Sequence, residues 1–164
     1  MIVVSNSSPL ITFARIGRLE LLRQLFGHIH IADEVYQEVA VRGAGRPAAE
    51  AVRTAVWIEI HPAAMPSLVG LQAGRALGAG EVATILLCSE LRADLAIIDE
   101  RKARRRAQGS GISVIGCVGI LEIGHRRGLV PDIRDVYANL LTQGIRIDQR
   151  ILDQSLIALG LSPL

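Results

Sequence analysis

Short apolar runs alternate along this chain with longer segments in which apolar residues recur every three or four positions. Each short run predicts a β-strand, and the runs lie at residues 2–4, 28–31, 57–60, 95–98 and 112–115. The run at 95–98 is uninterrupted, as expected for a central parallel strand buried on both faces. Because helical segments separate the strands, the pattern predicts an α/β fold whose mainly parallel sheet is covered by helices on both sides.

The helical segments have recognisable beginnings and ends. The first follows a Ser-Asn-Ser-Ser cluster, places Pro9 in its first turn and stops at Gly17. Further helices are expected at about residues 19–26, 32–41, 48–55, 81–91, 100–108, 117–127, 133–143 and 148–159. Residues 63–80, which include Pro66 and four glycines, predict no definite element. No repeat or linker is visible, so we expect one domain over residues 1–164, with the helices at about 133–160 packed on it or extending it.

Composition narrows the class of protein. The chain has 164 residues, of which half are hydrophobic and 3% aromatic, so its core must be built from Leu, Ile, Val and Ala. A net charge of +2 neither shows nor excludes nucleic-acid binding. No apolar run is long enough to span a membrane and no basic leader precedes the first strand, so we expect a soluble cytoplasmic protein.

The cysteines and histidines give no motif. Cys88 and Cys117 lack the spacing of a zinc or redox site and are expected to be reduced, buried thiols. The histidines show no metal-ligand spacing with one another and are expected to be structural or surface residues: His28, His30, His61 and His125.

Four side chains with oxygen atoms are expected near one edge of the predicted sheet. Two of them follow strands, and two lie on helices. Asn6 and Asp99 follow predicted strands, and functional residues gather at the carboxyl ends of parallel strands. Glu81 opens a long helix, and Glu38 lies on the helix after the second strand. A cluster of carboxylates at such an edge most often holds Mg²⁺ or Mn²⁺ for phosphodiester cleavage.

Each of these residues also has a simpler explanation. Asn6 could cap the first helix, and Asp99 could cap the helix that begins near residue 100. Glu81 could complement a helix dipole, and Glu38 could belong to a solvated face. The basic run after Asp99 could likewise be a solvated helix face or could neutralise a phosphate backbone; it contains Arg101, Lys102, Arg104, Arg105 and Arg106.

Taken together, these segments resemble the PIN domain, and most closely the prokaryotic PIN-like proteins related to VapC toxins. The resemblance rests on the motifs at residues 4–11, 35–39, 80–85, 97–101 and 116–128, and it covers the chain to about residue 150. It implies a three-layer α/β/α domain. It also implies a Mg²⁺- or Mn²⁺-dependent endoribonuclease, the toxin of a toxin–antitoxin pair, whose partners are RNA, a small antitoxin and a second copy of itself.

The resemblance also assigns roles to individual residues. Glu38, Glu81 and Asp99 fall on the acidic positions that bind metal and carry catalysis, and Asn6 falls on the first-strand acid, which is usually Asp. Ser8 matches a small hydroxyl residue beside that position. We expect RNA to contact Ser8 together with three members of the basic run: Arg101, Lys102 and Arg105.

Asn6 separates two hypotheses about function. An amide oxygen can bind Mg²⁺ but brings no charge, so metal binding should be weaker than with four carboxylates. The alternative to the nuclease is therefore a catalytically weak or inactive PIN-fold module that binds RNA or protein. A phosphatase or hydrolase of another α/β family is disfavoured, because no Asp-x-Asp motif follows the first strand.

Overall fold

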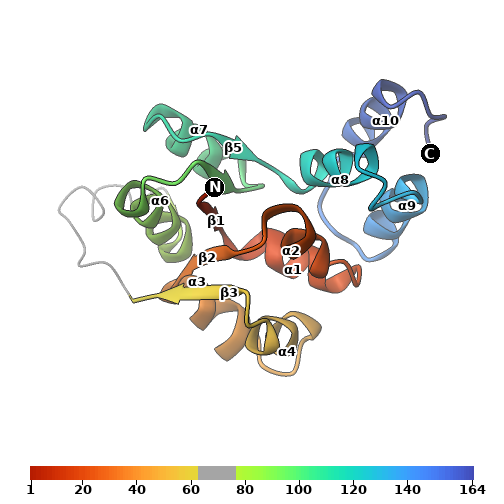
Figure 1. Ribbon diagram of the computed structural model, residues 1–164. Helices are drawn as coiled ribbons and strands as arrows, with labels where there is room; N and C mark the ends of the chain where they lie inside the picture. The colour runs from red at the N-terminus through yellow and green to blue at the C-terminus, as the bar shows by residue number, and fades with distance from the viewer. Residues whose placement is uncertain (63–76) are drawn as a thin grey trace.

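A five-stranded parallel sheet forms the centre of the computed structural model, which describes residues 1–62 and 77–164 (Figure 1). The strand order is β3-β2-β1-β4-β5. The strands are β1 Val3–Ser5, β2 Ile29–Ala32, β3 Ile58–His61, β4 Leu95–Ile97 and β5 Val114–Ile115. All five predicted runs therefore become strands, with ends that differ by one or two residues from those expected.

The connections between strands are helical. Along the chain these helices are α1 Ser7–Arg15, α2 Glu20–Phe26, α3 Asp33–Tyr36, the π-helix η1 Gln37–Val41, α4 Pro47–Thr54, α6 Ala79–Leu91 and α7 Arg101–Gly109. Because crossovers between parallel strands are almost always right-handed, this strand order puts α1 to α4 on one face of the sheet and α6 and α7 on the other. The predicted three-layer α/β fold is confirmed.

One predicted helix differs in kind, and one predicted region lies outside the described residues. Residues 32–41 were expected to form a single α-helix. They form one α-helical turn that continues as a π-helix. The uncertain region 63–80 falls mostly in residues 63–76, which are not described; its last part enters α6 at Ala79.

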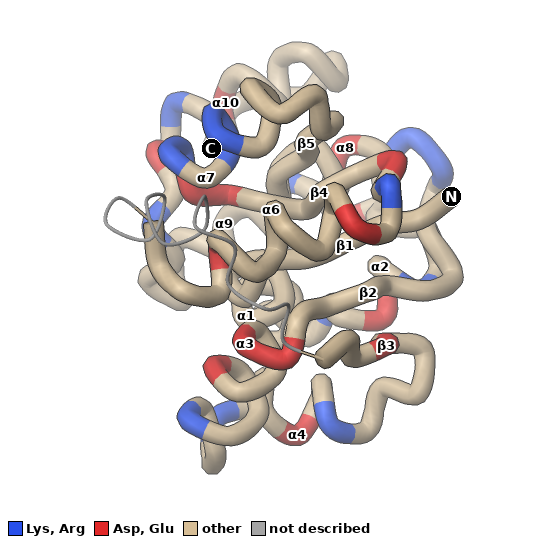
Figure 2. The backbone as a smooth tube through the Cα atoms, turned by 90° about the vertical axis from the view of Figure 1, so that its left-hand side faces the viewer, with Lys and Arg blue, Asp and Glu red and all other residues tan. Residues whose placement is uncertain are grey.

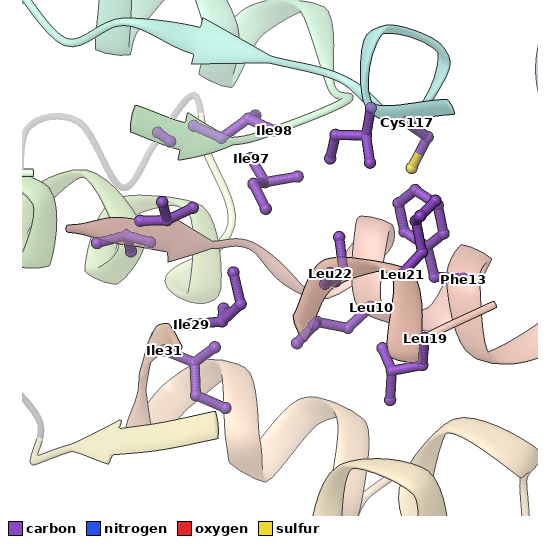
Figure 3. Close-up of a cluster of buried hydrophobic side chains, with 14 of the residues drawn as sticks. Leu10, Phe13, Leu19, Leu21, Leu22, Ile29, Ile31, Ile97, Ile98 and Cys117 are labelled. Atoms are coloured by element: carbon purple, nitrogen blue, oxygen red, sulfur yellow. The ribbon is translucent and has the colours of Figure 1, made fainter. Parts of the chain in front are cut away.

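Aliphatic side chains from the N-terminal and C-terminal halves of the chain fill one core. Figure 3 shows Ile29 and Ile31 of β2 and Ile97 of β4 in a cluster with leucines of α1 and α2. All three isoleucines are fully buried. Since side chains alternate across a strand, the residues next to them point to the opposite face of the sheet.

The carboxyl ends of the strands meet at one edge. Ser5 at the end of β1 pairs with Ile97 at the end of β4. Figure 2 shows α1, α3 and α7, which follow β1, β2 and β4, on the same side of those strands. The connection from β1 leads to β2 on one side, whereas β4 on its other side leads to β5, so the strand order reverses between β1 and β4. Ligands of open α/β sheets bind at such a point.

The C-terminal helices gather at one end of the molecule (Figure 1). They are α8 Cys117–Arg126, α9 Ile133–Thr142 and α10 Gln149–Ala158. A buried hydrogen bond of 2.6 Å joins the hydroxyls of Tyr137 in α9 and Ser155 in α10, and Ser155 also donates to Glu122 of α8 at 2.5 Å. In the described part of the chain, no helix is long and apolar enough to cross a membrane.

Candidate functional site at the carboxyl edge of the sheet

Asn6 lies directly after β1 and is almost completely buried, with 4% of its surface exposed. Its backbone N–H donates to the carbonyl of Ile97 at 3.0 Å, which extends the pairing of β1 with β4. Its Oδ1 accepts a long hydrogen bond of 3.4 Å from Thr84 in α6. Although Asn6 stands at the N-cap position of α1, its side chain accepts no N–H from that helix. The capping explanation is therefore wrong, and the amide oxygen faces α6 instead.

Glu38 lies in the π-helix η1, an element that is rare and frequent at functional sites. Its Oε2 accepts a hydrogen bond of 2.7 Å from the hydroxyl of Ser7, at the start of α1. The same oxygen lies close to the backbone of α6, since a Cβ on Gly80 would stand only 2.9 Å from it. Glu38 is exposed, as the solvated-face explanation expects, but one of its carboxylate oxygens also bonds to the first turn of α1 and lies against the first turn of α6.

Glu81, one residue further along α6, turns back on its own helix. Its Oε2 accepts a hydrogen bond of 2.8 Å from the backbone N–H of Gly78, the N-cap residue. This contact satisfies one of the free N–H groups at the start of the helix. Glu81 lies in the first turn of α6, as its simpler explanation as a charge that complements the helix dipole requires, and the hydrogen bond adds a capping contact that the sequence did not indicate.

Asp99 follows β4 and is fixed by a residue from another helix. Its Oδ1 accepts from the backbone N–H of Cys117 at 2.8 Å, and its Oδ2 accepts from the Cys117 thiol at 2.8 Å. Asp99 therefore caps α8, and the expectation that it caps the helix after it is wrong. That role belongs to Glu100, whose carboxylate accepts from the N–H of Lys102 at 3.4 Å.

The Cys117 thiol is a donor that keeps its proton. Burial raises the pKa of this thiol well above its ordinary value, and the neighbouring Asp99 carboxylate raises it further. A charged carboxylate next to a neutral S–H is the arrangement in which the hydrogen bond is retained at neutral pH. Both predicted thiols, Cys88 and Cys117, are free and buried.

The basic run lies on α7, next to the acidic end of β4 (Figure 2). Three of its side chains that were expected to contact RNA are exposed: Arg101, Lys102 and Arg105. Arg104 instead turns inward, and its Nη1 donates to the carbonyl of Ile98 at 2.9 Å. Ser8 is exposed on α1, whereas its neighbour Ser7 is buried and holds Glu38.

The oxygen donors share an edge without forming one tight group. Over residues 1–62 and 77–164, Glu38, Glu81 and Asp99 do not bring one oxygen each within 4.8 Å of one another. Glu34, one helical turn before Glu38, carries an Oε2 that is buried and lacks a hydrogen-bond partner among the described residues. An all-oxygen donor set of this kind fits Mg²⁺ or Mn²⁺, and Mg²⁺ usually keeps several waters between itself and part of its ligands.

Two features of the structure had no signal in the sequence analysis. One is the set of residues that position the acids, namely Ser7, Thr84 and Cys117. The hydroxyls of Ser7 and Thr84 are visible as possible hydrogen-bond donors in the sequence. Their partners cannot be identified there, because they lie far away along the chain. The other is the contact of His30 with His61, which the spacing of the histidines in the sequence does not indicate.

Comparison with known proteins agrees with this fold. The sequence model of the family DUF3368, described as a PIN domain, matches residues 2–160. A solved PilT N-terminus domain protein from the hyperthermophilic archaeon Sulfolobus solfataricus P2 has a similar fold, with a TM-score of 0.53. The two chains are 18% identical, and the similarity covers 73% of this chain and 90% of the archaeal one. No curated protein matches the sequence significantly.

Proposed function

The chain belongs to the PIN domain family, whose members are typically metal-dependent nucleases, and from this premise we propose that it is a Mg²⁺- or Mn²⁺-dependent endoribonuclease. The observation that carries the proposal is the position of Asn6 and Asp99. They follow two neighbouring parallel strands at the point where the strand order reverses. Oxygen donors at that point suit a hard divalent cation and a phosphodiester substrate.

The chain prepares two of the acids for this role before any ligand binds. Asp99 is held through both oxygens by Cys117, and Glu38 is held by Ser7. Fixed carboxylates lose little freedom on binding, which favours a productive geometry. Glu81 must leave Gly78 if it is to face the same ligand, so it is the mobile member of the proposed set.

A bound divalent cation would lower the pKa of a coordinated water and stabilise the leaving oxygen of the cleaved phosphodiester. Asn6 would contribute a neutral carbonyl oxygen to this site. Arg101, Lys102 and Arg105 would hold the RNA backbone next to it, because they are exposed and adjoin Asp99 along the chain. Binding through such contacts weakens as the salt concentration rises. Ser8, also exposed, is placed at the start of α1 to contact the same substrate.

The biological role that fits this activity is that of the toxin in a toxin–antitoxin pair. Its support is the resemblance to VapC-related proteins. The proposed partners are a small antitoxin, which would present a basic side chain to the acidic site, and a second copy of the chain. Copurification with the product of a neighbouring small reading frame tests the first partner, and the mass of the isolated protein in solution tests the second.

The experiment that tests the nuclease compares three purified proteins: the unmodified chain, Asn6→Asp and Asp99→Asn. Cleavage of defined RNAs is measured while Mg²⁺ or Mn²⁺ is titrated. We expect weak activity that is greater with Mn²⁺, because Mn²⁺ binds most nitrogen and oxygen sites more readily than Mg²⁺ does. Asn6→Asp should bind Mg²⁺ or Mn²⁺ more tightly, and Asp99→Asn should bind neither of these two ions and cleave no RNA.

One alternative function is favoured by a separate observation. Glu81 caps its helix and Asn6 carries no charge, so the structure also suits a PIN-fold module that binds RNA or protein without cleaving it. If the unmodified protein and Asn6→Asp are folded but neither binds metal nor cleaves any RNA offered, this alternative is the better account.

A further inference from the structure

A second group of metal-ligand side chains lies on β2 and β3 and consists of His30, Glu59 and His61. His30 pairs with Glu59 across the two strands, and His61 is two residues beyond Glu59. Side chains alternate along a strand, so all three point to the same face of the sheet, opposite the buried isoleucines of these strands. Strands far apart in the sequence thus bring three donor atoms within 4.8 Å of one another.

The distances within this group are short and similar. His30 Nδ1 lies 3.0 Å from His61 Nε2. The two oxygens of Glu59 lie 3.5 Å from His30 Nδ1 and 3.6 Å from His61 Nε2. Ligands of a single tetrahedral Zn²⁺ stand about 3.3 Å apart, because each bond to the metal is about 2.0–2.2 Å long. The separation of the two nitrogens lies just below that value, and each nitrogen lies just above it from a different oxygen of the Glu59 carboxylate.

A hydrogen bond can join the two histidines of this group, but it does not include Glu59. Between two neutral imidazoles, one ring N–H can donate to the lone pair of the other. The carboxylate of Glu59 is then left over, since its distances exceed the range of about 2.7–3.2 Å for ordinary N–H···O bonds.

We propose that His30, Glu59 and His61 form a binding site for Zn²⁺ or a chemically similar transition-metal ion. Two imidazoles and one carboxylate select such ions over Mg²⁺, which prefers oxygen ligands. The side chains of His30 and His61 are only 18% and 19% exposed and stand on paired strands, so both nitrogens are preorganised. The side chain of Glu59 is 61% exposed and can adjust to complete the site. Three protein ligands leave a coordination position for water.

This site uses none of the residues proposed to bind Mg²⁺ or Mn²⁺ at the carboxyl edge, and its nitrogen ligands give it a different metal preference. The proposal therefore does not depend on nuclease activity. Zn²⁺ or Co²⁺ alone serves as the probe, with an excess of Mg²⁺ present to occupy the oxygen site.

The test is a titration of the metal-free, full-length protein with Zn²⁺ by calorimetry. We expect one equivalent to bind, and Co²⁺ to give the visible absorption of a low-coordinate site with nitrogen ligands. Glu59→Gln keeps an exposed side chain of the same size and should retain the fold. It should lose about tenfold or more in affinity, since even partners behind the ligands of a metal site contribute about 10–100-fold. The double variant His30→Gln/His61→Gln should show no saturable binding.

Two matched controls separate this site from others. His125→Gln removes a histidine that bonds to the carbonyl of Val130 and not to the group, and Asp99→Asn removes a carboxylate of the other site. Both should bind Zn²⁺ like the unmodified protein. Absence of saturable Zn²⁺ binding, or binding that Glu59→Gln and the double variant leave unchanged, would overturn the proposal.

Discussion

The substitution Gly80→Ala should displace the carboxylate of Glu38 while leaving the stability of the fold almost unchanged. The new Cβ would stand 2.9 Å from Glu38 Oε2 and 3.6 Å from Ser7 Oγ. Ordinary contact begins at 3.4 Å, so the carboxylate must move by about 0.5 Å, which lengthens its hydrogen bond to Ser7. The neighbour that moves is the end of a flexible side chain, so the backbone need not shift.

The two effects of this change have different magnitudes. Ala is favoured over Gly within a helix by up to about 1 kcal/mol, and the weakened hydrogen bond costs a similar amount, so the free energy of unfolding should change by less than about 1 kcal/mol. Misplacing a catalytic group by about 1 Å can cost about 100-fold in rate. We therefore expect RNA cleavage to fall about tenfold, together with a lower affinity for Mn²⁺.

Cleavage rate, Mn²⁺ affinity and urea unfolding are measured on the same preparations. The control is Gly109→Ala at the end of α7, where a Cβ meets no atom within 4 Å. It should leave cleavage rate and Mn²⁺ affinity unchanged, while the free energy of unfolding stays the same or rises by up to about 1 kcal/mol because Ala is favoured over Gly in a helix. If Gly80→Ala cleaves RNA and binds Mn²⁺ as the unmodified protein does, the carboxylate of Glu38 has no part in the site. If both activities fall only in proportion to the unfolded fraction, the reasoning from geometry is refuted as well.

Two further predictions concern the cysteines. Cys117→Ala removes one of the two donors to Asp99 and should lower Mn²⁺ affinity, whereas Cys117→Ser, which keeps a donor, should retain more of it; equal losses in the two variants would show that the thiol does not position Asp99. Burial raises the pKa of Cys88 to about 12 and that of Cys117 well above its ordinary value. The unfolded thiols ionise near pH 9 while the folded ones keep their protons, so the free energy of unfolding should fall as the pH rises past this value, by about 1.4 kcal/mol per pH unit for each thiol. Urea unfolding at neutral and alkaline pH measures this slope, which should be smaller in Cys88→Ala than in the unmodified protein. Equal slopes in the two proteins would show that Cys88 does not contribute to the pH dependence.

The strands and most helices could be predicted because their signals are local. The run at 95–98 is apolar throughout and becomes the interior strand β4, and Pro9 and Gly17 indicate the start and the end of the first helix through their own backbone preferences. The π-helix that carries Glu38 was missed. Its hydrogen bonds span five residues, and the apolar spacing of residues 32–41 does not distinguish that pattern from an α-helix.

The contacts that build the two proposed sites could not be predicted from the sequence, for a different reason. The bond of Asp99 to Cys117 joins the end of one strand to the start of a helix 18 residues later, and both ends look like ordinary helix boundaries in the sequence. His30 and His61 meet only because β2 pairs with β3 in one particular register. Strand order and register come from packing of the whole sheet, which no local pattern specifies.

Asn6 is consistent with its surroundings even though it departs from the usual acid. It is buried and, within residues 1–62 and 77–164, its side chain accepts a single long hydrogen bond, so a carboxylate there would carry a poorly solvated charge in the absence of metal. A neutral amide avoids that cost and still offers an oxygen towards α6. The price is weaker attraction for a divalent ion, and the fixed Asp99 and Glu38 must then supply most of the negative charge. In the proposed nuclease, two hydrogen-bonded carboxylates and a neutral first-strand residue would together give weak affinity for the metal ion.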